Sequence, residues 1–425
     1  MKICLSKIKQ LTSFEYASNY FKIGVFLLLS APGIAVIFLL FSSLISFIKK
    51  RHLFLKDKLN FYLIASSIFM ILSCIHKSFQ DNYPYENWSP SLSWYGLANW
   101  IPLFLFFWSF QPFLNSDLSR RKISLLFIYG TLPLLITGIL QYFFGVYGPF
   151  ETLNGLIIWF SRPLAFDQGL TGLFNNPNYA GAWLSIVFPF SLATIVEKEK
   201  SKLKFISYLF FILILIVLIL TFSRSAWLNA SLSVLLILGK SGILFLFPII
   251  ILIGFIAFGC ILGLDGFITN EIISSKFCPN FQELGFNNSH RLIIWSNALD
   301  LIKSRAFLGY GASSFALLYL IKSGRVTTHS HNILIEIAIN YGSIVALILG
   351  IFVSHLIFKG FKKLYLIKYA TNPINNFDRA WWISILVIAL SHMYDNQYYD
   401  LRISISSWII LAGIRNIIKE KKILT

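Results

Sequence analysis

The sequence has 425 residues, of which 56% are hydrophobic and only 13% are charged. A soluble domain carries about 25% charged residues, so this chain has too few to cover a surface in water, and its mean hydropathy of +0.71 excludes a soluble fold. The net charge of +18 is spread over short clusters between apolar runs. That spacing excludes a single basic face for nucleic acid and is typical of membrane loops.

Apolar runs long enough to cross a membrane recur along the chain, since a helix needs about 20 apolar residues to do so. Eleven runs approach this length, near 23–48, 59–76, 98–115, 123–146, 179–196, 204–222, 225–239, 243–263, 331–357, 379–394 and 401–418. The first contains Ala31-Pro32-Gly33, a helix-breaking sequence. We expect it to form two spans, the first beginning near Tyr16. The predicted fold is therefore an all-α polytopic transmembrane bundle of about 12 spans, one membrane domain over residues 1–425.

The basic clusters predict the orientation, because Lys and Arg concentrate in cytoplasmic loops. Counted back from the basic tail at Arg415 to Lys422, every second loop is basic, and 12 spans place both termini in the cytoplasm. Three segments then face outward: residues 146–178, the turn Ser223-Arg224-Ser225, and one large extracytoplasmic loop over residues 264–330 that contains short amphipathic helices. The cytoplasmic loops are short and carry no phosphate-binding glycine motif, so an ATP- or NAD-dependent activity is not expected.

Arg224 is the first candidate for anion binding. It follows a long apolar run and lies among serines, on the outer side, where the charge bias does not favour basic residues. Arginine near membrane depth usually faces protein or water, although an ordinary loop charge would also account for it. Asn178, before the next apolar run, is a supporting candidate or simply the N-cap of a helix.

Arg291 is the second candidate. Residues 288–303 have the pattern of an amphipathic helix, with an apolar stripe at Leu292, Trp295, Leu299 and Ile302 and with Asn288 or Ser289 as its N-cap. Arg291 would lie in the first turn, where the helix dipole disfavours a cation. Free backbone N–H groups beside an arginine suit a phosphate, and a surface arginine is the plainer alternative.

The stretch from His329 to Asn332 ends the large loop and precedes an apolar helix. A histidine at a membrane boundary, in the field of two arginines, is expected to be neutral near pH 7. It could then take a proton from a hydroxyl, or it could be only an interfacial or capping residue. A metal site is not expected, because an i, i+2 histidine pair splays on a helix and no acidic cluster accompanies it.

Nearby carboxylates are weaker candidates. Glu336, one turn into the same helix, could orient a polar network or form an internal ion pair. Asp395 and Asp400 lie in the last outer turn and receive less weight than Glu336.

The ordered motifs resemble those of the O-antigen ligase and polymerase superfamily of bacterial membrane proteins. They are Asn176-Pro177-Asn178, Ser223 to Trp227, Arg291 with Trp295, Leu308 to Gly311, and His331-Asn332 with Gly342. The resemblance covers roughly residues 170–350.

The resemblance implies a glycosyltransferase of lipopolysaccharide or polysaccharide biosynthesis in the bacterial plasma (inner) membrane. Such an enzyme transfers a glycan from an undecaprenyl-pyrophosphate-linked donor to a hydroxyl of a glycan, lipid or protein acceptor, without a metal or other cofactor. Carried over to this chain, Arg224 and Arg291 would bind the pyrophosphate and His331 would be the catalytic base. Asn178, His329, Asn332 and Glu336 would support them.

Other functions remain open. A cyanobacterial branch associated with inorganic-carbon accumulation is similar in the asparagine and arginine motifs and lacks the His-Asn pair, so a transporter or transport-associated protein is the alternative. A protein that binds or flips a lipid-linked sugar without catalysis would keep the arginines and not need the histidine. Midspan acids for ion coupling are scarce in the sequence, which counts against transport.

Overall fold

The computed structural model describes residues 13–54, 56–79, 89–164, 168–197, 204–244, 246–247, 251, 290–366 and 375–420. The expected span at 243–263 lies almost entirely outside these described residues, and so do the expected caps Asn288 and Ser289.

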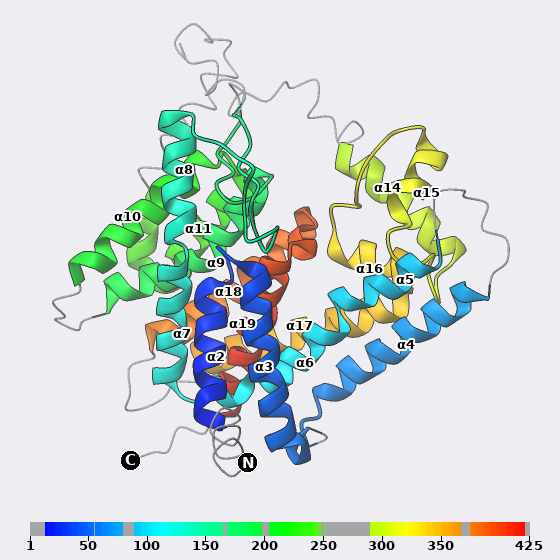
Figure 1. Ribbon diagram of the computed structural model, residues 1–425, viewed down its shortest axis with the longest axis horizontal. Coiled ribbons are helices and arrows are strands. Elements are labelled where there is room, and N and C mark those ends of the chain that lie inside the picture. Colours follow the sequence, from blue (N-terminus) through cyan, green and yellow to red (C-terminus); the bar gives the residue numbers. More distant parts are fainter. Residues whose placement is uncertain are drawn as a thin grey trace, which may run out of the picture.

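The described chain is almost entirely helical (Figure 1). The helices before residue 150 are α2 (Phe14–Leu27), α3 (Pro32–Lys50), α4 (Asn60–Ser78), α5 (Ser91–Gly96), α6 (Ile101–Ser109), α7 (Asp117–Gly130) and α8 (Leu132–Phe144). A short antiparallel hairpin follows, formed by β1 (Phe150–Thr152) and β2 (Ile157–Trp159). The later helices are α9 (Pro177–Val196), α10 (Lys204–Leu220), α11 (Arg224–Leu238), α14 (His290–Ser304), α15 (Phe315–Ser323), α16 (Ile333–Tyr341), α17 (Ser343–Phe361), α18 (Asn376–Tyr394) and α19 (Leu401–Lys419).

Six helical segments in the described ranges are long and apolar enough to cross a membrane. They are Pro32–Lys50, Asn60–Ser78, Asp117–Phe144, Pro177–Val196, Ser343–Leu366 and Leu401–Lys419. The helices α10 and α11 are also apolar but shorter. The protein is therefore a helical, multi-pass membrane protein, while the count of 12 spans stays a prediction.

The expected break at Pro32 is confirmed, because α2 ends at Leu27 and α3 begins at the proline. In the run 123–146, α7 and α8 are separated only by Thr131 and form one continuous apolar segment. Two other runs that were expected to be single helices are interrupted. The run 98–115 contains only the nine-residue α6, which ends before a short 3₁₀ turn containing Pro112. The run 331–357 is divided at Gly342, whose φ of 97° is open mainly to glycine.

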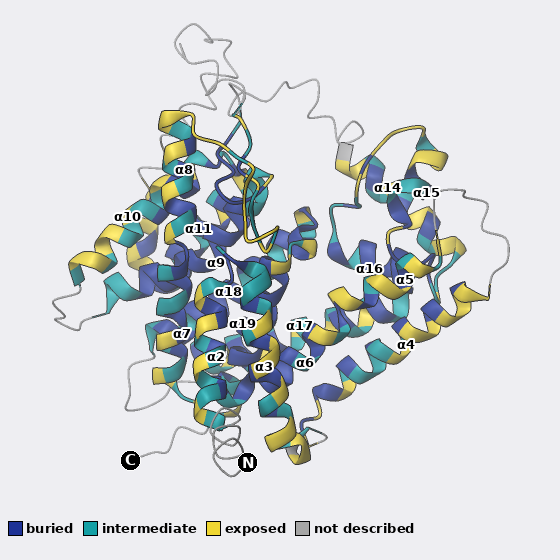
Figure 2. Ribbon diagram, viewed as in Figure 1, coloured by how far each residue is buried: buried dark blue, intermediate teal, exposed yellow. Residues whose placement is uncertain are grey.

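The helices α9, α18 and α19 form the centre of the bundle. They are buried along almost their whole length, and α9 packs against α10, α11 and α18 (Figure 2). By contrast, α3, α4 and α10 expose many large apolar side chains. An apolar outer surface is expected of helices that face lipid.

Ion pairs hold the helices together at one end of the bundle, where α2 begins and α19 ends. The buried Arg120 guanidinium lies 2.7 Å from a carboxylate oxygen of Asp378 and 2.8 Å from one of Glu420. Asp57 contacts Arg415 at 2.6 Å and Lys419 at 2.7 Å. These contacts join α7, α18 and α19 to the segment that precedes α4.

The helices α14 and α15 pack on α16 around a small apolar cluster of their own, apart from the main core. The buried face of α14 consists of Ile294, Ala298 and Leu301. The expected stripe is therefore wrong for Leu292 and Leu299, which are exposed. Its other members, Trp295 and Ile302, are partly buried against this cluster. Apolar residues occur on several sides of this helix, so periodicity alone does not select the buried one.

Candidate functional site

The residues 329–332, called here the histidine turn, come directly before α16. Asn332 is the N-cap, and its Oδ1 accepts hydrogen bonds from the backbone N–H groups of Leu334 at 3.0 Å and Ile335 at 3.2 Å. His331 has φ of 55°, in the left-handed region. The buried Glu336 accepts a 2.9 Å hydrogen bond from the Ser330 backbone N–H. Glu336 therefore holds the turn, and it forms no ion pair with the described residues.

Asp395, which follows α18, brings a carboxylate to both histidines. Its Oδ1 lies 3.2 Å from Nδ1 of His331 and 3.7 Å from Nε2 of His329. The two imidazole rings are 4.3 Å apart and meet edge to face. The expectation that the pair splays on a helix is wrong, because both residues precede the helix.

The electrostatics assign the protons. Burial raises the pKa of Asp395, but the His331 hydrogen bond and the fields of both histidines lower it more, so the pKa lies below its usual value. An ionised carboxylate only accepts hydrogen bonds. The His331 Nδ1 must then carry a proton, which leaves the lone pair of the neutral ring on Nε2.

His329 is held in its neutral form. Burial lowers its pKa, and so do His331 and Arg291, while Asp395 opposes them. Its Nδ1 accepts a 3.3 Å hydrogen bond from the His331 backbone N–H. That bond leaves the ring proton on Nε2, which faces Asp395.

The same three side chains could hold a metal ion. Their ligand atoms, two imidazole nitrogens and one carboxylate oxygen, lie within 4.8 Å of one another. Zinc accepts such a set. The sequence shows no acidic cluster beside the two histidines, and the fold supplies the carboxylate from Asp395, which lies far along the chain.

An arginine pocket lies beside Asp395, with a volume of about 630 Å³. Arg224 and Arg291 both line it, as does Asn178, so the structure brings these three predicted residues together. Arg224 is the first residue of α11, and Arg291 lies in the first turn of α14. Two helix starts, each with an arginine, therefore contribute to one pocket, which is favourable for an anion.

Arg162, after the β-hairpin, also lines the arginine pocket. Its Nε is buried and has no hydrogen-bond partner among the described residues. Sequence reasoning missed this residue, although it is an arginine in an expected outer loop, the same signal that singled out Arg224. Asn178 is not the helix cap, because that role falls to Asn176, whose Oδ1 accepts from the Asn178 backbone N–H at 2.8 Å.

A hydrogen bond ties the pocket to the histidine turn. The Trp295 indole N–H donates to the Ser330 carbonyl oxygen at 2.9 Å. Trp295 lies one helical turn after Arg291, which explains in physical terms the four-residue spacing of this motif: one residue faces the pocket and the other fixes its helix to the turn. Asn332 adds a weaker bond to the Met393 carbonyl oxygen at 3.3 Å.

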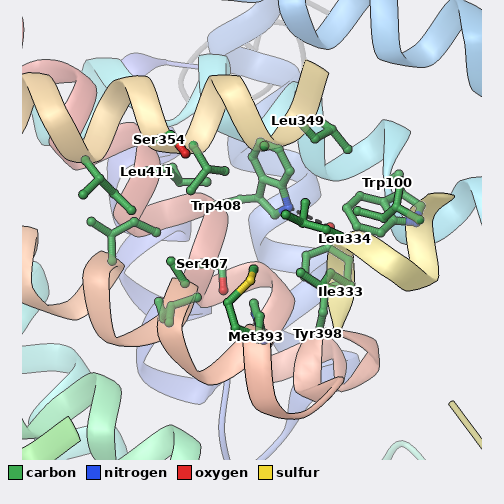
Figure 3. A pocket seen from close by; sticks show the side chains of 18 residues that line it. Trp100, Ile333, Leu334, Leu349, Ser354, Met393, Tyr398, Ser407, Trp408 and Leu411 are labelled. Atoms are coloured by element: carbon green, nitrogen blue, oxygen red, sulfur yellow. Dashed lines mark hydrogen bonds between the residues drawn. The ribbon is translucent and has the colours of Figure 1, made fainter. Parts of the chain in front are cut away.

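An apolar cavity of about 150 Å³ lies on the α17 side of the turn, where Ile333 and Leu334 begin α16 (Figure 3). Trp408, Met393 and Tyr398 line it, and the Trp408 indole donates to the Tyr398 hydroxyl at 2.9 Å. Such a lining suits hydrocarbon rather than a charged group.

A comparison with protein families agrees with this geometry. Residues 209–350 match the family model described as O-antigen ligase, and this segment contains Arg224, Arg291 and the histidine turn. Arg162, Asn178 and Asp395 lie outside it. A search of curated proteins found no match. The chain is therefore a multi-pass membrane protein in which residues 209–350 are similar to the O-antigen ligase family, and this match supports the resemblance to the O-antigen ligase and polymerase superfamily.

Proposed function

We propose that the protein transfers a glycan from an undecaprenyl-pyrophosphate-linked donor to an acceptor hydroxyl, without a metal, on the extracytoplasmic face of the plasma membrane. One observation carries this proposal. A hydrogen-bonded His331–Asp395 pair borders a pocket that three arginines line. A base beside an anion site is what attack by a hydroxyl on a sugar pyrophosphate requires.

The arginines would bind the leaving group. Arg224 and Arg291 place guanidinium groups around one pocket, and Arg162 adds a third. Guanidinium meets phosphate oxygens with paired N–H groups and stays charged. These residues would therefore hold the pyrophosphate and stabilise the charge that develops as its bond to the sugar breaks.

His331 would activate the acceptor. Its Nε2 takes the hydroxyl proton while the acceptor oxygen forms a bond to the anomeric carbon. The bond from that carbon to the pyrophosphate oxygen breaks, and undecaprenyl pyrophosphate leaves with the bonding electrons. Asp395, at 3.2 Å, stabilises the imidazolium and keeps the ring in the required tautomer.

The orientation follows from the same proposal. The arginine pocket and the histidine turn would face the extracytoplasmic side, and the ion-paired end of the bundle would face the cytoplasm. Basic residues surround that end, at Lys49, Arg51, Lys122 and Lys419, as the charge rule for cytoplasmic ends predicts.

Release of undecaprenyl pyrophosphate from a lipid-linked glycan by the purified protein tests the proposal. His331→Asn is the preferred variant, because asparagine tolerates the left-handed backbone at this position better than alanine does. We expect release by the wild type and its loss in the variant. His52→Asn, an exposed histidine at the other end of the bundle, is the matched control and should keep full release. Absence of release by folded wild-type protein across several donors and acceptors would refute the proposal.

A further inference from the structure

A second polar cavity, called here the asparagine pocket, is lined by His329 of the histidine turn and has a volume of about 400 Å³. This size is in the range of small-molecule sites. Its lining is polar and aromatic. Its polar side chains include Asn340, Asn396 and Glu336, and its rings include Tyr179 and Tyr341.

Several polar atoms of this lining are buried without a hydrogen-bond partner among the described residues. They are both side-chain polar atoms of Asn396, Oδ1 of Asn340 and the hydroxyl of Tyr341. These side chains are almost fully buried, with exposed fractions of 0%, 2% and 1%. Buried polar groups are normally satisfied. A set of unsatisfied groups around one cavity therefore indicates a ligand that completes them.

The chemistry of these atoms selects a class of ligand. An amide offers a donor and an acceptor, and a phenol offers both on one atom. Together they match hydroxyl groups, which also donate and accept. A phosphate only accepts, and none of the described arginines lines this cavity. The aromatic rings suit the apolar faces of a sugar ring.

The residues that line the two pockets explain how such a ligand would lie close to His331 and Asp395. Asn178 lines the arginine pocket and Tyr179 lines the asparagine pocket; Asp395 and Asn396 divide in the same way. His329 lines the asparagine pocket, 3.7 Å from Asp395. Consecutive residues thus line different cavities, and His329 of the asparagine pocket lies next to Asp395 of the arginine pocket.

Gly96 helps to keep the cavity open. A Cβ at this position would lie 2.6 Å from the Tyr341 hydroxyl oxygen and 2.4 Å from Cβ of Ala312. A larger residue would therefore displace the wall of the pocket or cover the hydroxyl.

We propose that the asparagine pocket binds a sugar unit of a glycan substrate through Asn340, Asn396 and Tyr341, next to the His331–Asp395 pair. This inference rests on the proposed function for the identity of the glycan. It extends that function by a second subsite that suits hydroxyl groups, next to the arginine pocket that would bind phosphate.

Binding measurements on the full-length purified protein test the inference. The probes are inorganic pyrophosphate and the phosphate-free repeat-unit oligosaccharide, freed by mild acid from the lipid-linked glycan of the cells that make the protein. Tyr341→Phe removes only a hydroxyl that has no protein partner among the described residues, so this variant should fold. We expect it to weaken oligosaccharide binding roughly five- to tenfold, the value of one hydrogen bond, and Asn396→Ala to weaken it further.

The two pockets provide the control. Pyrophosphate binding should be unchanged in Tyr341→Phe and Asn396→Ala, whereas Arg224→Ala should weaken pyrophosphate and spare the oligosaccharide. Equal oligosaccharide affinity in wild type, Tyr341→Phe and Asn396→Ala would overturn the inference, even if the enzyme releases undecaprenyl pyrophosphate. Oligosaccharide binding that depends on these residues in a protein without release would support the subsite and refute the proposed reaction.

The inhibition pattern identifies which substrate supplies the sugar. If free oligosaccharide inhibits competitively with the acceptor at saturating donor, the pocket binds the acceptor glycan. Competition with the donor assigns it to the donor glycan. Failure to inhibit at concentrations that occupy the site would overturn the inference.

Discussion

Basic side chains gather at both ends of the helix bundle, and their partners differ. At the end where α19 finishes, Arg120, Arg415 and Lys419 each contact a carboxylate at 2.6 to 2.8 Å. At the other end, Arg162, Arg224 and Arg291 line a pocket in which Asp395 is the only described acid. Within the described ranges none of these three forms an ion pair.

The contrast distinguishes cations that hold the fold from the pocket arginines, which would bind a ligand under the proposed function. A buried ion pair stabilises mainly in the sense that removing one partner leaves the other charge uncompensated. Arginines that lack carboxylates gain their partner only when an anion binds. Changes at the paired end should therefore alter stability, and changes at the pocket end should alter activity.

The largest effect is expected for His331→Asn. Loss of a general base lowers the rate by about 10²–10⁴-fold, so release of undecaprenyl pyrophosphate should fall by that factor. Thermal stability should stay near that of the wild type, since asparagine fits the backbone. A variant that unfolds at a much lower temperature instead would show that the histidine turn is structural.

Asp378→Asn should produce the opposite result. It leaves the fully buried Arg120 with one carboxylate among the described residues, the partly exposed Glu420, and breaking a buried pair costs about 3–5 kcal/mol. Thermal unfolding in detergent should show a clear loss of stability, while the folded fraction keeps its release activity. Unchanged stability would contradict the interpretation that the ion pairs at this end stabilise the fold.

Arg224→Ala and Arg291→Ala should each lower kcat/KM by about 10²-fold, the effect of removing one donor that stabilises developing charge. Neither should lower the unfolding temperature, because neither removes an ion pair among the described residues. Arg325→Ala is the matched control, an exposed arginine outside both polar pockets, and should leave activity intact. If Arg224→Ala and Arg291→Ala keep full activity like this control, the two arginines have no role in the reaction.

A smaller effect concerns His329 and pH. Burial, His331 and Arg291 lower its pKa in the fold, so the unfolded chain binds the proton first as the pH falls through about 6.5. Stability should therefore decrease below that pH, until the folded state also takes up the proton. Unfolding temperatures from pH 7.5 to 5.5 should fall less in His329→Asn than in the wild type. Equal slopes would contradict the assignment of a neutral His329.

The smallest effect is expected for a chelator. With His331 as the base and the arginines as the phosphate ligands, EDTA should leave the release rate unchanged. Loss of release that zinc restores would instead identify His329, His331 and Asp395 as metal ligands.

The sequence allowed the arginines of the pocket to be predicted but not the position of Asp395. Arg224 and Arg291 were expected to bind phosphate and Asn178 to support the site, and all three line one pocket. Arg224 could be recognised because it follows a long apolar run, and Arg291 because a cation is unusual in the first turn of a helix. Asp395 was ranked too low, since only tertiary packing brings it to a histidine 64 positions away.

The boundaries of helices were hidden where apolar residues continue across them. Gly342 divides α16 from α17 by its backbone alone: a Cβ there would lie 1.9 Å from the Phe307 carbonyl oxygen. A break that depends on such contact leaves hydropathy unchanged. The unpartnered atoms of Asn340 and Asn396 were likewise beyond sequence reasoning, because an asparagine looks the same in a sequence whether its amide is satisfied or not.

The hydrogen bond from Trp295 to Ser330 has a consequence for the binding of the two substrates. It joins the helix that carries Arg291 to the turn that carries His331, so a shift of either segment is transmitted to the other. Pyrophosphate bound at Arg291 would stabilise the position of His331, and an acceptor bound at His331 would stabilise the position of Arg291. Linkage requires such cooperativity to be reciprocal: each substrate should raise the other's affinity by one common factor. In Trp295→Phe, which keeps an aromatic side chain and removes the N–H donor, that factor should fall toward one, so that each substrate binds independently of the other.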